Sequence, residues 1–347
     1  MDFTGATSRT TGEPALVIDG LTTWIRQDEA IVHAVDGVNL SIASGETVGL
    51  VGESGSGKSM TAMSIMRLLP PRGAIVAGSV RLLGQELTTL NERGMRRVRG
   101  NDIAMVFQDP LTSLNPTMSV EDQIVEAVRL HKRVGRREAQ RRALEVLDLV
   151  RVPNPKERLR SYPHQLSGGL RQRVMIAIAL ACGPRVLIAD EPTTALDVTI
   201  QAQILDLIDS LKRQLSMAVL LITHDLGVVA GRADHVRVMY AGRIVEQAPV
   251  EELFTHTHHP YSEALLRSIP QEGDNKLVPL FTIPGQPPDL TQAHTCCVFA
   301  DRCRYVQADC REFTPLLAPK SGHGYACFHP VGSGADPSPR AEAIATA

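Results

Sequence analysis

The segment ETVGLVGESGSGKSM, residues 46–60, decides the fold. Its apolar first half predicts a buried strand. Its second half, GESGSGKS at 52–59, matches the pattern G-x-x-x-x-G-K-[ST]. The glycines let backbone N–H groups turn inward on phosphates, because a Cβ would obstruct that conformation. The helix that we expect to begin at Lys58 adds about half a positive charge at the same place. The segment therefore predicts a strand, a phosphate-binding loop and a helix, the P-loop arrangement of an α/β protein.

The residues of this loop have expected roles. Lys58 can reach the β- and γ-phosphates of a nucleoside triphosphate, and the Ser59 hydroxyl can ligate Mg²⁺. The residues expected to contact the nucleotide are Gly52, Glu53, Ser54, Gly55, Ser56, Gly57, Lys58, Ser59 and Met60. A P-loop alone fits kinases, GTPases and helicases equally well, so other motifs have to decide the class.

Two acids follow a second buried strand. VLIADEP at 186–192 ends its apolar run in Asp190 and Glu191, at the strand end where ligands bind in open α/β sheets. We expect Asp190 to hold Mg²⁺ through water, and Glu191 to polarise the attacking water as general base. Alone, the two acids could equally cap a helix; downstream of a P-loop they indicate hydrolysis.

LSGGLRQR at 166–173 predicts a second anion site. Ser167, Gly168 and Gly169 are expected to precede a helix that begins near Leu170, so backbone N–H groups would again point at an anion. Two such sites in one chain are best explained if both serve one nucleotide. The alternative is a Gly-Gly loop that only caps a helix.

Composition narrows the class further. The chain has 347 residues, 43% of them hydrophobic, and its 36 Lys and Arg against 38 Asp and Glu give a net charge of −2. This balance argues against a nucleic-acid partner. The sequence has neither a signal peptide nor an apolar run of about 18 residues that could span a membrane. We therefore expect a cytoplasmic protein that touches a membrane only through its partners.

The predicted elements fall into an α/β core with insertions. We expect a leader at 1–14, an ATPase domain at 15–255 with an inserted helical subdomain at about 109–168, a C-terminal extension at 256–330 and a disordered tail at 331–347. Residues 15–43 are β-rich, a strand pair flanks Gly78, and VRVMYAGRIVEQA predicts a hairpin that turns at Ala241-Gly242. The other predicted strands are 103–107, 186–190 and 218–223, and the predicted helices are 58–69, 119–131, 136–151, 171–182 and 199–214.

The set of motifs resembles the ATPases of ABC transporters. GESGSGKS, VFQDP, LSGGLRQR, VLIADEP, ALD at 195–197 and ITHD occur in the family's order, and the resemblance covers roughly 15–255. It implies a P-loop NTPase (RecA-like) α/β core with an antiparallel β-subdomain and an inserted helical subdomain. It also implies two ATPase domains that meet head to tail, each ATP lying between the P-loop of one and the Ser-Gly-Gly signature of the other.

The resemblance assigns further residues by position. Gln108 would contact Mg²⁺ or water and relay occupancy to the transmembrane subunit, and His224 would contact the γ-phosphate. Ser167 and Gly169 would bind the partner's γ-phosphate, with Gly168 beside them, and Asp197 would cross the dimer interface. Trp24 would stack on adenine, although Ile25 could fill the aligned position and core packing is the other explanation for the tryptophan.

Three further segments resemble the oligopeptide/dipeptide importers: DPLTSLNPTMSV at 109–120, YPHQLSGG at 162–169 and HHPYSEALLRSIP at 258–270. This resemblance implies an ATPase (translocase) on the cytoplasmic side of the inner membrane. Its partners would be a homologous second ATPase in a heterodimer, two permease subunits and, indirectly, an extracytoplasmic peptide-binding protein. The alternatives are an importer ATPase for nickel or another small solute, and a soluble ABC ATPase that acts on DNA or the ribosome.

The C-terminal cysteines suggest a metal site. Cys297, Cys303, Cys310 and Cys327 have the spacing C-x5-C-x6-C-x16-C, and four thiolates suffice for Zn²⁺ or a [4Fe–4S] cluster. Importers with this cysteine pattern carry an iron–sulfur cluster, so the resemblance favours [4Fe–4S], with zinc, a redox or regulatory sensor and unmetallated thiols as alternatives. Cys296 is left out because adjacent cysteines seldom bind one metal, and Cys182 is assigned to packing.

Overall fold

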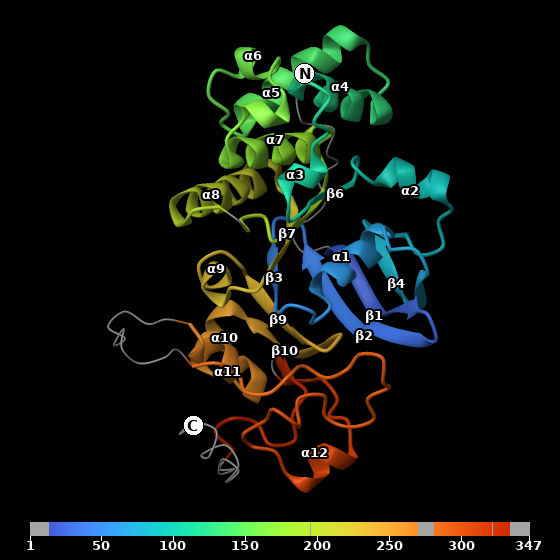
Figure 1. Cartoon of the computed structure of the whole chain (residues 1–347), viewed down its shortest axis with the longest axis vertical. Helices are drawn as coiled ribbons and strands as arrows, with labels where there is room; N and C mark the ends of the chain where they lie inside the picture. Colours follow the sequence, from blue (N-terminus) through green and yellow to red (C-terminus); the bar gives the residue numbers. More distant parts are fainter. Residues whose placement is uncertain (1–13, 195, 270–280, 321, 334–347) are drawn as a thin grey trace. The chain divides into compact units, whose positions relative to one another are not determined.

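A computed structural model describes residues 14–194, 196–269, 281–320 and 322–333 (Figure 1). Residues 1–13 of the leader expected at 1–14, Ala195 of the ALD motif, Pro270 and residues 334–347 of the tail expected at 331–347 lie outside the described residues. Pro14 begins the first strand and is therefore not part of a leader. The described residues divide into two compact units. Unit 1 contains 14–17, 40–47, 80–194 and 196–222; unit 2 contains 18–39, 48–79, 223–269, 281–320 and 322–333.

Unit 1 is built on three parallel strands in the order β8-β7-β6. These are β6 Ile103–Val106, β7 Val186–Asp190 and β8 Ala218–Thr223, and all three are buried along their whole length. Continuous burial is expected for parallel strands that are covered on both faces. The same unit holds β5 Gln85–Glu86, which pairs with the end of β4, and α2 Glu92–Val98.

The helices of unit 1 follow two of these strands. Between β6 and β7 lie α3 Pro110–Ser113, α4 Val120–His131, α5 Arg136–Leu149, α6 Pro155–Arg158, the short 3₁₀ turn Pro163–Gln165 and α7 Gly168–Leu180. Helices α4, α5 and α7 contact one another, as their grouping in Figure 1 shows. α8 Val198–Leu215 follows β7 and contacts α7. The helices predicted at 119–131 and 136–151 are confirmed as α4 and α5.

Unit 2 contains a mixed run of strands in the order β11-β12-β10-β9-β3. β3 Thr47–Val51 pairs in parallel with β9 His235–Tyr240, and β9 forms a hairpin with β10 Arg243–Pro249. The hairpin turns at Ala241 and Gly242, both at positive φ, as predicted. β12 His323–Tyr325 pairs with β10, and β11 Ala318–Lys320 pairs with β12 and forms the edge of the sheet.

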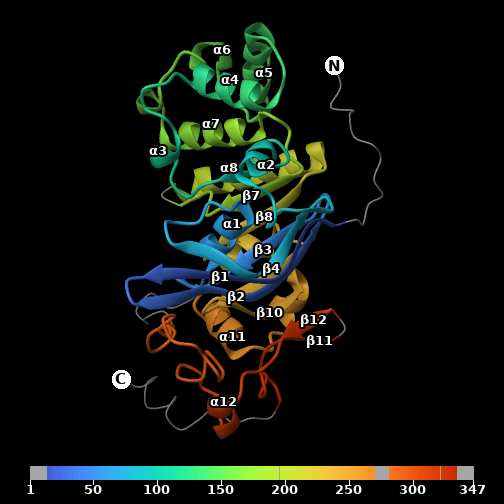
Figure 2. The same cartoon turned by 90° about the vertical axis from the view of Figure 1, so that its right-hand side faces the viewer.

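Unit 2 also contains helices, from one directly after the phosphate loop to one in the C-terminal extension. They are α1 Lys58–Met66, α9 Leu226–Ala230, α10 Val250–Thr255, α11 Pro260–Arg267 and α12 Ala308–Glu312. Figure 2 shows residues 281–317 as an irregular path that carries α12.

An antiparallel sheet has the order β2-β1-β4, with β1 Pro14–Gln27, β2 Ala30–Ala43 and β4 Gly73–Leu82. Two predicted details are wrong. β4 is one strand that runs through Gly78, not a pair that flanks it, because Gly78 adopts a φ of 87° and a Cβ there would lie 2.4 Å from the Gly20 carbonyl oxygen. The signature helix begins at Gly168, with Ser167 as N-cap, not near Leu170.

Replacing Ile188 by alanine should destabilise unit 1. Ile188 is fully buried in the middle strand β7, and such a truncation costs about 3 kcal/mol of unfolding free energy through lost burial and a cavity. Denaturant unfolding followed by circular dichroism should show the lower midpoint. Leu130→Ala, at a side chain that is 74% exposed on α4, is the matched control and should change the midpoint little; equal midpoints for the two variants would contradict this account of the core.

Candidate functional site

The phosphate loop of unit 2 is shaped by glycines in left-handed conformations. Gly52, Gly55 and Gly57 have φ values of 155°, 78° and 107°. A Cβ on Gly52 would approach the Met239 carbonyl oxygen to 2.2 Å, and one on Gly57 would approach that of Ala34 to 2.5 Å. Only glycine fits at these two positions. The loop therefore keeps its backbone bare, as a phosphate cradle requires.

Lys58 folds back over this loop. It is the first residue of α1 and is 5% exposed. Its Nζ donates to the carbonyl oxygens of Gly52 and Glu53, at 2.8 and 2.9 Å. These two bonds hold the ammonium over the loop, where the P-loop pattern places the phosphates of a nucleotide.

The acids of unit 1 lie where the sequence predicts. Asp190 ends β7 and is 5% exposed, and Glu191 follows at a positive φ of 45°. Nε2 of Gln108, 83 residues earlier, donates to Oε2 of Glu191 at 2.9 Å. The hydroxyl of Thr194 donates to the same carboxylate oxygen at 2.9 Å. The structure thus brings together the predicted water-polarising acid and the predicted glutamine, and it adds Thr194, which sequence reasoning missed although it lies three residues after the acid.

The signature motif forms the exposed start of a long helix. Ser167 is the N-cap of α7, and its side chain makes no capping hydrogen bond. Ser167 and Gly168 are exposed, so the N–H groups of the first turn face outward. Gly169 lies against α8, where a Cβ would meet Ile200 Cγ2 at 2.9 Å. Because α7 begins at Gly168 and not near Leu170, both glycines lie in its first turn. The N–H groups of a first turn have no earlier helical carbonyl to bond.

The other residues that the resemblance assigns to the nucleotide site are all at least partly exposed. Asp197 is exposed and caps α8, accepting a 3.0 Å hydrogen bond from the Ile200 N–H. His224 is exposed between β8 and α9 in unit 2. Trp24 is 36% exposed on β1 and packs edge-on against His33 of β2, with ring centroids 5.1 Å apart. Ile25, the alternative to Trp24, is half-buried.

Four cysteines converge on one cavity of unit 2. Cys297, Cys303, Cys310 and Cys327 line it together with Phe299, Tyr305 and His329, whereas Cys296 does not. Burial raises the pKa of Cys297 to about 11 and the pKa values of Cys303 and Cys327 to about 12. Burial also raises the pKa of Cys310. All four thiols are therefore protonated at neutral pH unless a cation stabilises the thiolates.

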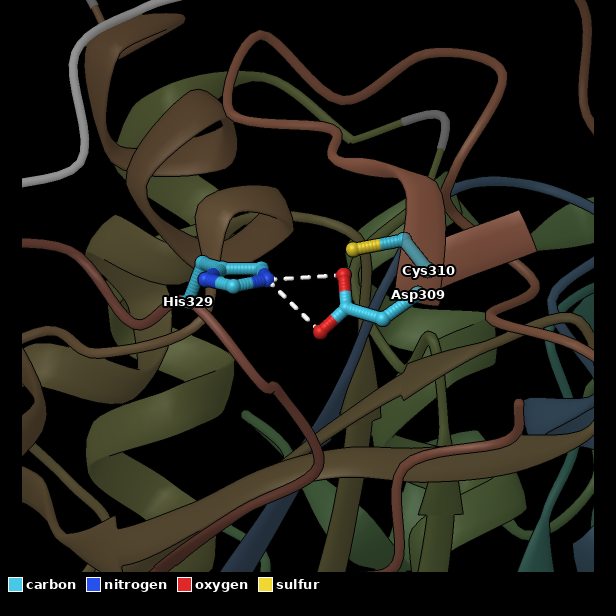
Figure 3. Close-up of side chains that lie close together, drawn as sticks. All are labelled: Asp309, Cys310 and His329. Atoms are coloured by element: carbon cyan, nitrogen blue, oxygen red, sulfur yellow. Dashed lines mark hydrogen bonds and ion pairs between the residues drawn. The ribbon is translucent and has the colours of Figure 1, made fainter. Parts of the chain in front are cut away.

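A second group of possible ligands lies beside Cys310. Asp309, Cys310 and His329 place one ligand atom each within 4.8 Å of one another (Figure 3). His329 Nε2 is 2.8 and 2.9 Å from the two carboxylate oxygens of Asp309. Cys182, by contrast, is buried in unit 1, where its thiol donates to the Ala127 carbonyl oxygen at 3.6 Å, in keeping with a packing role.

Sequence reasoning also missed two residues that hold the phosphate loop. The Tyr261 hydroxyl accepts a hydrogen bond from the Glu53 N–H at 2.8 Å, and Arg302 forms an ion pair with the Glu53 carboxylate at 2.6 Å. Tyr261 lies in the HHPYSEALLRSIP segment, which resembles the importers as a whole but does not single out this tyrosine. No sequence pattern marks Arg302.

Comparisons with known proteins show the family of this chain. A family model described as "ABC transporter" matches residues 35–194, and one described as "Oligopeptide/dipeptide transporter, C-terminal region" matches 245–310. A protein of Sinorhizobium fredii named "Probable peptide ABC transporter ATP-binding protein y4tR" is 54% identical over 315 residues, which cover 90% of this chain and 94% of that protein.

Two solved structures share the fold. The dimeric ATP-binding cassette MJ0796, in a post-hydrolysis state with ADP and Pi, is 29% identical with a TM-score of 0.61, covering 68% of this chain and 98% of that one. CbiO1 of Clostridium perfringens, part of the ABC transporter complex cbiONQ, is 26% identical with a TM-score of 0.61, covering 70% and 92%. The α/β P-loop cassette with its antiparallel β-subdomain, expected from the sequence, is thereby confirmed.

The glycine-shaped phosphate loop, the paired acids and the signature helix define an ABC-type ATPase, which couples ATP hydrolysis to transport. ATP and Mg²⁺ are the ligands typical of this class. The chain belongs to the oligopeptide/dipeptide import family of ABC transporter ATP-binding proteins.

Replacing Gly57 by alanine should weaken ATP binding about tenfold or more, because the new Cβ meets the Ala34 carbonyl oxygen and φ is left-handed. Titration with a fluorescent ATP analogue measures the loss. Gly135→Ala is the matched control: Gly135 has a φ of −72° and open space where its Cβ would lie. Wild-type affinity in the Gly57 variant would show that the loop tolerates a side chain there.

Proposed function

We propose that this chain hydrolyses ATP in a dimer with a homologous second ATPase and drives two permease subunits. The chain is the ATP-binding subunit of a peptide ABC importer. The family match favours peptides over the other transported solutes considered, such as nickel, and over a role on DNA or the ribosome. A peptide-binding protein outside the cytoplasm would deliver the substrate, and no nucleic acid would be involved.

One observation carries the hydrolytic part of the proposal: two hydrogen bonds, from Gln108 and Thr194, hold the Glu191 carboxylate beside the buried Asp190. A carboxylate fixed in this way can accept a proton from an attacking water. Ser59, Gln108 and Asp190 would hold Mg²⁺, and Lys58 and His224 would contact the phosphates. Positioning and charge neutralisation supply most of the catalysis in phosphoryl transfer.

The outward-facing start of α7 supports the dimer. The first-turn N–H groups beside the exposed Ser167 and Gly168, and the half-buried Gly169, could bind an anion. In the proposed dimer they would bind the γ-phosphate held by the partner's P-loop, and Asp197 would lie at the interface. The MJ0796 structure, a dimer with ADP and Pi, is consistent with this assembly. Trp24 would stack on adenine, since its ring is partly exposed on β1.

The proposed domain organisation has an ATPase domain at 15–255, with its helical subdomain at about 109–168, and an extension at 256–330. Within the described residues, no helix is both long enough and apolar enough to cross a bilayer. We place the protein at the cytoplasmic face of the inner membrane, attached through the permease subunits.

Glu191→Gln should abolish ATP hydrolysis and trap an ATP-bound dimer, because the amide cannot accept the water's proton. Phosphate release measures the rate, and size-exclusion chromatography with MgATP measures the dimer. The surface variant Glu138→Gln removes an exposed carboxylate that pairs with Arg141 and should leave both readouts unchanged. Hydrolysis at the normal rate by the Glu191 variant would remove this residue from the role of general base.

The cysteine cavity is proposed to hold a [4Fe–4S] cluster, with zinc as the alternative. Four thiols that line one cavity fit the ligand number of either group. The raised thiol pKa values mean that cation binding would release protons. Cys297, Cys303, Cys310 and Cys327 would be the ligands. Such a group would supply cross-linking of the irregular extension, and a cluster would add redox sensitivity.

Protein purified without oxygen should contain about four irons per chain and absorb broadly near ~400 nm. Cys303→Ser, which removes a thiol of the cavity, should lower the metal content. Cys296→Ser is the matched control and should retain it, since Cys296 lies outside the cavity. One zinc per chain and no colour would select the alternative, and neither metal in the wild type would leave the cavity as packed thiols.

A further inference from the structure

An arginine of the cysteine-bearing extension reaches into the phosphate loop. Arg302 lies between Cys297 and Cys303, and its side chain is only 4% exposed. Nη1 and Nη2 donate to the two carboxylate oxygens of Glu53 at 2.6 and 3.0 Å. Paired N–H···O bonds of this kind are among the strongest and most directional in proteins. All of these residues belong to unit 2.

The guanidinium is fixed by further bonds. Nε donates to the Pro284 carbonyl oxygen at 2.9 Å, and Nη2 donates to that of Ile283 at 3.3 Å. Nη1 also donates to the Tyr240 hydroxyl at 3.3 Å. Arg302 therefore cannot swing away without losing several bonds at once, and the position of Glu53 follows the position of the extension.

The main chain of Glu53 is held by the same part of the protein. Its N–H donates to the hydroxyl of Tyr261, which is fully buried on α11. The Tyr261 ring packs on Tyr240 and Phe299, with centroids 4.5 and 5.4 Å away. Phe299 lies in the same turn as Arg302. Both the backbone and the side chain of Glu53 are thus held by residues of the C-terminal extension, Tyr261 and Arg302.

Glu53 also lies next to the phosphate-binding lysine, because the Lys58 ammonium donates to the Glu53 carbonyl oxygen at 2.9 Å. A change at Glu53 therefore moves an acceptor of the lysine that neutralises the phosphates. A misplacement of about 1 Å in a catalytic site can cost two orders of magnitude in rate.

We propose that Arg302 is a positioning residue of the nucleotide site: through its paired hydrogen bonds to Glu53, the cysteine-bearing extension sets the geometry of the phosphate loop. Arg302 contacts no substrate in this scheme. It acts on ATP only through Glu53.

The proposal extends to the cysteines, and this extension rests on the metal site proposed above. Successive backbone bonds close the turn that contains Arg302 and both flanking cysteines: Ala300 N–H to Cys297 O at 3.1 Å, Arg302 N–H to Phe299 O at 3.0 Å and Cys303 N–H to Ala300 O at 3.3 Å. A group bound to Cys297 and Cys303 would fix this turn and hence the guanidinium. Loss of that group would loosen the phosphate loop.

A double-mutant cycle on the full chain tests the Arg302–Glu53 link. Arg302→Met and Glu53→Gln should each weaken ATP binding about tenfold, as expected for loss of a buried paired hydrogen bond, and the double variant should be no weaker than either single one. Arg302→Lys, which keeps the charge but not the fork, should recover part of the affinity. ATP competing with a fluorescent analogue gives the dissociation constants of the folded protein.

Asp301→Asn is the matched control, since Asp301 is the neighbouring residue and pairs with Arg311 at the surface; it should bind ATP like the wild type. A general loss of folding would lower the bound fraction but not the affinity of the folded protein, and it would not be rescued by lysine. Additive losses in the double variant, or unchanged affinity in Arg302→Met, would overturn the proposal.

Cys303→Ser separates the two proposals. In an otherwise wild-type chain it should weaken ATP binding, but in the Arg302→Met chain it should have little further effect, because the link is already broken. If Cys303→Ser weakened ATP binding by the same factor in the wild-type and Arg302→Met chains, the proposal that the cysteines act on the phosphate loop through Arg302 would be overturned. Absence of metal from the wild-type protein would refute the metal site alone and leave the outcome of the Arg302–Glu53 cycle standing.

Discussion

The close approach of backbone to the phosphate loop is the constraint on which the rest of unit 2 depends. The carbonyl oxygens of Met239 and Ala34 lie where side chains at Gly52 and Gly57 would be. The end of β9 and the strand β2 can approach the loop this closely only because these positions are glycine. The Lys58 side chain folds back over the loop. Glu53 of the same loop is held by Tyr261 and Arg302, which lie in the C-terminal part of the chain. The packing of these strands against the loop therefore also sets the shape of the nucleotide site in this unit.

Much of the fold could be predicted because each motif sits at a boundary between elements. The strand before the loop, the strand ending in Asp190 and the turn at Ala241-Gly242 all carry local signals. The start of α7 could not be placed, since two glycines suggest a loop by propensity. In the structure Ser167 caps the helix, and tight packing of Gly169 on Ile200 favours the absence of a side chain there. Tertiary contact overrode the local signal.

The site was predictable to the extent that its residues belong to motifs. The meeting of Gln108 with Glu191 follows from the parallel pairing of β6 with β7, which brings their ends to one edge. Arg302 and Glu53 are 249 residues apart, and nothing in the local sequence of either indicates the other. Spacing likewise could not choose between Cys296 and Cys297 by itself. Cys297 lines the cavity and Cys296 does not. That choice depends on the path of the folded chain, which the spacing of the cysteines does not give.

The pairing of β12 with the edge of β10 has a consequence for the order of biosynthesis. Glu246 and Gln247 of β10 are opposite Tyr325 and Gly324, and the fully buried Glu246 carboxylate bonds His323. Until residues 323–325 leave the ribosome, β10 is an open edge with an uncovered charge. Three of the cavity's cysteines are also made before the fourth. The nascent chain therefore has to keep both an unpaired strand and three thiols from wrong partners until β12 and Cys327 have been made.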